Sequence, residues 1–118
     1  MTTISEQIRK EFLDECHDDY VGLWKLVWRF ENSLRRSNTD LIRDLTLRLL
    51  EELLNEQLVK AGMPNRKGEF QAWRESPDEV IIRIKSEWDK LGRPPKIGDI
   101  VWFTTTKKGD AQLRKQKR

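Results

Sequence analysis

Apolar side chains at helical spacing in residues 19–34 constrain the fold of this chain most. They fall on one stripe of a predicted helix: Tyr20, Leu23, Trp24, Val27 and Trp28. A stripe of this width must be covered by other elements, so the helix is expected at the centre of the core. Since 118 residues make one domain of ordinary size, this core is the one around which the whole chain folds.

Two more helices are predicted beside the central one, over residues 4–16 and 40–56. The first begins with the spacing of a capping box, from Thr3 to Glu6. The third carries leucines at intervals of three and four residues. Residues 57–61 either extend this third helix or begin a short strand.

The second half of the chain mixes strand and helix patterns. Residues 69–73 alternate polar and apolar side chains, as in a short strand, and residues 99–105 are rich in β-branched and aromatic types. Between them, Ser76-Pro77-Asp78-Glu79 predicts the start of a helix over about 77–90. The predicted fold is therefore α+β and mostly helical, with three N-terminal helices, this further helix and a two- or three-stranded sheet.

Two runs give the chain a winged-helix-like organisation. EELLNEQLVKAG (51–62) and IVWFTTTKKG (100–109) resemble the segments on either side of the wing in winged-helix proteins. The resemblance implies a wing tip at Met63–Gly68. The predicted helix 77–90, which interrupts the wing region, and three glutamates on the third helix depart from the pattern.

Three longer blocks resemble a family of small uncharacterised bacterial proteins. They are DDYVGLWKLVWRF (18–30), LTLRLLEELL (45–54) and WRESPDEVIIRI…EW…LGRPPKIGDIVWF (73–103). The resemblance implies one compact domain, and it implies no catalytic residue.

The net charge of +3 is unevenly distributed along the chain. Residues 107–118 hold six basic side chains and one acidic side chain, a net charge of +5, which leaves residues 1–106 at −2. We therefore expect a single compact domain over 1–106 and a basic C-terminal tail over 107–118, frayed or forming at most one short helix. The basic pI describes this tail and not the domain.

The expected location is the cytoplasm, without membrane contact. The chain has no apolar run of about 20 residues, and its N-terminus lacks the apolar core of a secretory signal. The single cysteine, Cys16, fits a reducing compartment.

No catalytic, cofactor or metal site is predicted. Cys16, His17, Asp18 and Asp19 are adjacent, but consecutive helical residues point about 100° apart and do not converge on one ion or substrate. The six glycines are scattered and form no phosphate-binding loop. The chain is therefore predicted not to be an enzyme and to need no cofactor.

The first functional hypothesis is a non-enzymatic binding or regulatory module that contacts another protein. Trp102 and Phe103 are the candidate contact residues, because neighbours on a strand face opposite sides and one of them can lie exposed. The third helix is a second candidate region. The identity of the partner and the oligomeric state stay open.

The alternative hypothesis is a DNA-binding winged helix that uses helix 40–56, the 63–68 loop and the basic tail. Six residues are its candidate phosphate contacts: Arg43, Arg48, Arg66, Lys67, Lys107 and Lys108. The glutamates of the third helix weigh against it, since they repel phosphate.

Overall fold

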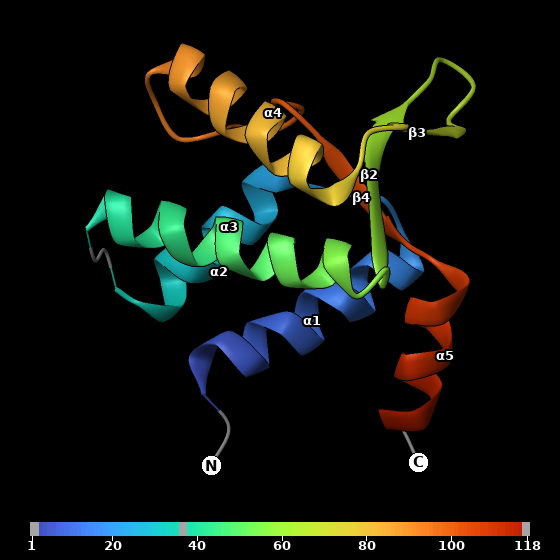
Figure 1. Cartoon of the computed structure of the whole chain (residues 1–118). Coiled ribbons are helices and arrows are strands. Elements are labelled where there is room, and N and C mark those ends of the chain that lie inside the picture. The colour runs from blue at the N-terminus through green and yellow to red at the C-terminus, as the bar shows by residue number, and fades with distance from the viewer. Residues whose placement is uncertain (1–2, 36–37, 117–118) are drawn as a thin grey trace.

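A computed structural model describes residues 3–35 and 38–116 of the chain. Its helices are α1 (Ile4–Asp18), α2 (Leu23–Ser33), α3 (Thr39–Asn55), α4 (Pro77–Leu91) and α5 (Lys107–Gln116). Its strands are β1 (Val21–Gly22), β2 (Val59–Pro64), β3 (Phe70–Ala72) and β4 (Trp102–Thr105). The fold is α+β and mostly helical, as predicted, and Figure 1 shows α2, α3 and α4 together on one side of the sheet.

The four strands form one antiparallel sheet in the order β1-β4-β2-β3. The last strand of the chain lies in the middle, between β1 and β2. One row across the sheet joins four small or aromatic residues: Gly22, Trp102, Gly62 and Ala72. The sheet is larger than the two or three strands predicted, because β1 has only two residues and so shows no alternation in sequence.

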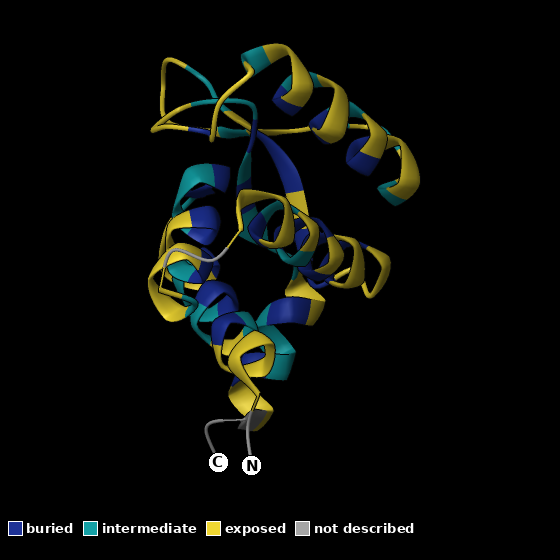
Figure 2. Cartoon of the chain, turned by 90° about the vertical axis from the view of Figure 1, so that its left-hand side faces the viewer, coloured by how far each residue is buried: buried dark blue, intermediate teal, exposed yellow. Residues whose placement is uncertain are grey.

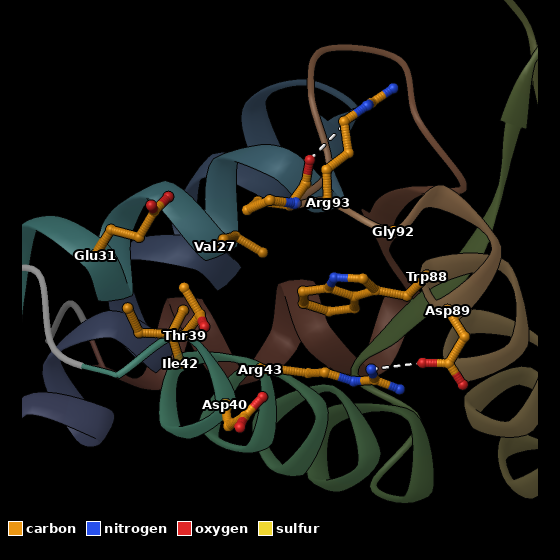
Figure 3. Close-up of a pocket in the computed structure, with 11 residues that line it drawn as sticks. Val27, Glu31, Thr39, Asp40, Ile42, Arg43, Trp88, Asp89, Gly92 and Arg93 are labelled. Atoms are coloured by element: carbon orange, nitrogen blue, oxygen red, sulfur yellow. Dashed lines mark hydrogen bonds and ion pairs between the residues drawn. The ribbon is translucent and has the colours of Figure 1, made fainter.

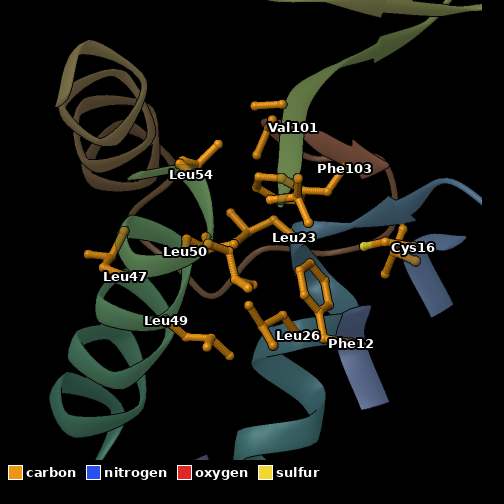
Figure 4. Close-up of a cluster of buried hydrophobic side chains, with 14 of the residues drawn as sticks. Phe12, Cys16, Leu23, Leu26, Leu47, Leu49, Leu50, Leu54, Val101 and Phe103 are labelled. Atoms are coloured by element: carbon orange, nitrogen blue, oxygen red, sulfur yellow. The ribbon is translucent and has the colours of Figure 1, made fainter. Parts of the chain in front are cut away.

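The core lies between the sheet and the helices, and it reaches from α1 to α4 (Figures 2 and 4). Phe12 of α1 meets Phe103 of β4 edge-to-face, with ring centroids 5.8 Å apart. Leu50 and Leu53 of α3 and Leu26 of α2 are fully buried beside them. Cys16 lies in the same cluster (Figure 4).

Capping side chains set the starts of three helices. Thr3 accepts a hydrogen bond from the Glu6 amide, and Asn38 accepts one from the Asp40 amide. Ser76 and Glu79 form the predicted capping box, with Pro77 in the first turn. Gly92, with φ +64°, ends α4 in the left-handed conformation.

The prediction of one helix over 19–34 is wrong for residues 19–22, of which Val21–Gly22 form β1. The Leu23 amide bonds to the Val101 carbonyl, which joins the start of α2 to the segment before β4. At Gly22 a Cβ would lie 2.7 Å from the Trp24 ring, so a larger residue there would push the indole out of its place. This pairing depends on residues 80 positions away and has no local signal.

The basic C-terminal segment forms α5. The Thr106 amide bonds to the Leu58 carbonyl, and Gly109 packs against the same carbonyl, where a Cβ would come within 2.1 Å. Leu113 is buried. These contacts hold the start of α5 against the end of β4 and the residue before β2.

The winged-helix organisation stays a prediction. The chain begins in the order helix, strand, helix, helix, strand, and β4 then pairs between β1 and β2. However, β3 and α4 lie between β2 and β4 in the chain. Met63–Gly68, the predicted wing tip, spans the end of β2 and the turn to β3.

Among the described helices, none is long and apolar enough to cross a membrane.

Candidate functional site

Cys16 is fully buried on α1. Burial raises the pKa of its thiol well above the usual range, and the Glu15 carboxylate raises it further. The reactive thiolate is therefore disfavoured. This position suits a small apolar core residue.

His17 is exposed and faces α5 instead of the thiol. Its Nδ1 lies 2.7 Å from Asp110 Oδ1, and that oxygen also accepts a hydrogen bond of 2.5 Å from Thr105 Oγ1. The hydrogen bond from Thr105 is the largest influence on the pKa of Asp110 and lowers it; partial burial opposes this, and the interaction with His17 lowers the pKa further. This cluster ties α1, β4 and α5 together. In residues 3–35 and 38–116, no three His, Cys, Asp or Glu side chains gather where they could hold a metal ion.

The candidate phosphate contacts on α3 lie in acidic surroundings. Arg43 forms an ion pair of 2.6 Å with Asp89 of α4 and stacks over Trp88, 5.5 Å from the ring centroid. Arg48 is exposed. The exposed positions of α3 also carry four carboxylates, and a fifth lies at its C-cap: Asp40, Asp44, Glu51, Glu52 and, at the C-cap, Glu56. The helix therefore presents net negative charge to solvent.

The remaining basic candidates lie in two places. Arg66 and Lys67 are exposed in the turn between β2 and β3. Lys107 and Lys108 are exposed in the first turn of α5, where they line a groove together with Lys60 of β2. The six candidates thus form no single surface.

A pocket of about 300 Å³ lies between α2, α3 and the end of α4. Trp88 projects into it between Val27 and Arg43, and the Arg43–Asp89 ion pair closes one side (Figure 3). Arg93 at its edge is held by Asp99, at 2.8 Å. Its volume is at the low end for small-molecule sites, and the two arginines already have acidic partners.

The structure places the two candidate contact residues on opposite faces of β4. Phe103 is fully buried against Phe12, whereas Trp102 points to the other face and is half-buried. Its neighbours in the row across the sheet are Gly22 and Gly62, which have no side chains to cover it. The indole therefore lies in the row between two glycines.

Three more aromatic side chains lie on this face. They are Tyr20, Trp24 and Phe70, each half-buried, and with Trp102 we name them the outer aromatic face. The Tyr20 and Phe70 rings are tilted with centroids 5.1 Å apart. A Cβ on Gly62 would meet the Phe70 ring at 2.7 Å, and one on Gly22 would meet the Trp24 ring at the same distance. The two glycines thus let the Phe70 and Trp24 rings lie close to the backbone of the sheet.

Sequence reasoning missed Tyr20, Trp24 and Phe70 as parts of this surface. Tyr20 and Trp24 looked like core residues of a single long helix, and Phe70 belonged to a strand whose partner was unknown. The only local signal was the pair of glycines, Gly22 and Gly62, next to apolar runs. The prediction that other elements cover the stripe of residues 19–34 is also wrong for Trp28, which is 50% exposed on α2.

Comparisons of the chain with protein-family models, with curated proteins and with solved structures gave no match.

Proposed function

We propose that this chain is a non-enzymatic binding module that contacts another protein through its outer aromatic face. The observation that carries the proposal is the gathering of four half-buried aromatic side chains, from three strands or strand ends and from α2, on one sheet face. Tyrosine, tryptophan and phenylalanine are enriched at the centres of protein interfaces and depleted on ordinary surfaces.

The energetic cost of burying the Trp24 indole N–H also supports a binding role for the outer aromatic face. The Trp24 Nε1 atom is buried without a hydrogen-bond partner among the described residues. A buried donor left without a partner costs about 1–3 kcal/mol. Packing for stability alone favours an aliphatic residue here, whereas a binding surface favours the broad, rigid indole.

The partner that fits this face presents aliphatic or aromatic groups. Each tryptophan offers a large apolar area with little rotamer entropy to lose, and such residues often contribute about 2 kcal/mol or more to binding. The lone thiol fits a reducing compartment, so we expect the module to act in the cytoplasm.

The proposal is tested by photo-crosslinking in the cells that produce the chain. A photoreactive amino acid replaces Trp102 in one variant and Ile82 in another, because Ile82 is 66% exposed on α4. We expect one discrete crosslinked protein from position 102 and none from position 82. Equal crosslinking at the two positions, or none at 102, contradicts the proposal.

A DNA-binding winged helix is the second proposal, and one observation favours it. Arg66 and Lys67 are exposed at the tip of the β2–β3 hairpin, where a wing would contact phosphates. The acidic surface of α3 opposes it. Anisotropy of a labelled mixed-sequence duplex, measured between low and moderate salt, tests this proposal, and an undetectable signal at low salt contradicts it.

A further inference from the structure

β3 forms an edge of the sheet that solvent reaches. In the order β1-β4-β2-β3 it pairs with β2 on one side only, and Figure 1 shows it in a hairpin that projects away from the helices. Glu69, Gln71, Ala72 and Arg74 are exposed along this segment, and Phe70 is half-buried. The strand at the opposite edge, β1, is buried. Of the two edges, β3 is therefore the one that another strand can approach.

The register with β2 decides which backbone groups of β3 point to this edge. The Trp73 amide bonds to the Ala61 carbonyl at 2.8 Å. Because bonding residues alternate along an antiparallel strand, Gln71 also bonds to β2, whereas Phe70 and Ala72 do not. The N–H and C=O groups of these two residues point away from β2. In the described part of the chain, no further backbone hydrogen bond takes them up.

This edge lacks the features that usually protect an open strand. Natural sheets place proline, charged side chains, a bulge or a covering element at such positions. The three residues of β3, Phe70, Gln71 and Ala72, are uncharged and contain no proline. An accessible edge of this kind favours pairing with a further strand.

Charges on the two sides of β3 favour a second copy of this chain as that strand. Arg66 and Lys67 are exposed in the turn before β3, and the carboxylates of Asp78 and Glu79 are exposed in the first turn of α4 after it. Two identical strands that pair antiparallel run in opposite directions, so the basic end of each lies beside the acidic end of the other. A parallel pair would instead bring like charges together.

The residues next to the strand are complementary in the same way. Glu69 directly precedes β3, and Arg74 lies two residues after it. When two copies pair about Gln71, residue 69 of one copy lies opposite residue 73 of the other. Glu69 therefore comes within one position of Arg74 of the second copy, and no like charges lie directly opposite each other between residues 68 and 74.

We propose that two copies of this chain pair antiparallel through β3, with Gln71 of each copy at the two-fold axis. Phe70 of each copy then lies opposite Ala72 of the other, so the N–H and C=O groups that point outward all gain partners. The two sheets join into one. The contact uses the strand edge and leaves Trp102 free, so this self-association goes beyond the binding proposed for the outer aromatic face.

A disulfide between copies tests the register. The two Gln71 residues form a non-hydrogen-bonded pair, whose Cα atoms lie about 4.5 Å apart, within the range that a disulfide spans. We expect Gln71→Cys to give a covalent dimer under mild oxidation, seen on a non-reducing gel. Ile82→Cys is the control, since Ile82 is 66% exposed on α4, and the native Cys16 is buried. Equal dimer from both variants, or none from Gln71→Cys, overturns the proposal.

Sedimentation equilibrium tests the backbone pairing without a crosslink. We expect the mass of the wild-type chain to rise with concentration from 14.1 kDa toward twice that value. Ala72→Pro removes an N–H that β2 does not use, so the fold is kept while the dimer weakens by at least about tenfold. Ala72→Ser keeps the N–H and is expected to associate like the wild type.

The contrary results are equally definite. A wild-type mass that stays at 14.1 kDa at every concentration overturns the proposal and leaves the edge to a strand of a different protein. Equal association of Ala72→Pro and Ala72→Ser also overturns it. If Ala72→Pro does not fold, the disulfide experiment decides. Trp102→Ala is expected to leave self-association unchanged, so failure here is distinguishable from failure of the outer aromatic face.

Discussion

Gly62 is a position where a single added methyl group should damage the fold. Its ideal Cβ would lie 2.2 Å from the Gln71 carbonyl oxygen, 2.7 Å from Phe70 Cε2 and 2.9 Å from the Ala72 Cα. Two of these three atoms belong to the backbone of β3 and cannot rotate away. Because normal contacts are about 3.5 Å, β3 must move by roughly 1 Å, which strains its pairing with β2.

We expect Gly62→Ala to lower the free energy of unfolding by about 3 kcal/mol, the upper end of the usual cost of overpacking. In urea unfolding followed by tryptophan fluorescence, a loss of this size shifts the midpoint by roughly 1.5 M for an m-value of about 2 kcal/mol/M. Gly92→Ala is the matched control, since no atom lies within 4 Å of its Cβ position and only its positive φ opposes the change. Its cost should be about 1 kcal/mol. If the Gly62→Ala variant is as stable as the Gly92→Ala variant, the backbone of β3 does not lie as close to Gly62 as described here.

Three further predictions concern the core and the α1–α5 contact. Phe103→Ala should lower stability by about 3–5 kcal/mol, whereas Trp28→Ala at an exposed position should change it by less than about 0.5 kcal/mol in the same unfolding assay. Cys16 should react with a thiol reagent only on unfolding, so labelling at the rate of free cysteine in native buffer contradicts its burial. Because the pKa of Asp110 is lowered in the folded chain, its contribution to stability is present above the usual carboxyl range and is lost as the pH falls through the folded value. Asp110→Asn should therefore reduce the loss of stability in acid, as measured by thermal unfolding across pH.

Local signals predicted the helices more closely than the sheet. The capping box at Ser76 and the leucine spacing of α3 are short-range patterns, and the structure has both helices within one or two residues of the predicted bounds. The strand at Val21–Gly22 has no such pattern. It exists because β4, 80 residues later, offers backbone partners to it.

The candidate site was predictable only in part, because it too depends on pairing between strands that are far apart in the sequence. Alternation along β4 indicated that Trp102 and Phe103 face opposite sides, but it could not say which of them faces the core. Tyr20 and Phe70 lie 50 residues apart in the sequence and meet only in the folded sheet. Long-range pairing of this kind leaves no trace in residue spacing.

We propose that the outer aromatic face binds a protein. The most direct measurement is the dissociation constant of the partner captured at position 102, compared between the wild-type chain, Trp102→Ala and Trp28→Ala. Both variants remove an indole, but Trp28 lies outside the outer aromatic face. We expect Trp102→Ala to weaken binding by about 30-fold, or roughly 2 kcal/mol, and Trp28→Ala to leave it unchanged. Equal affinity in all three proteins, or a greater loss in Trp28→Ala, contradicts the claim.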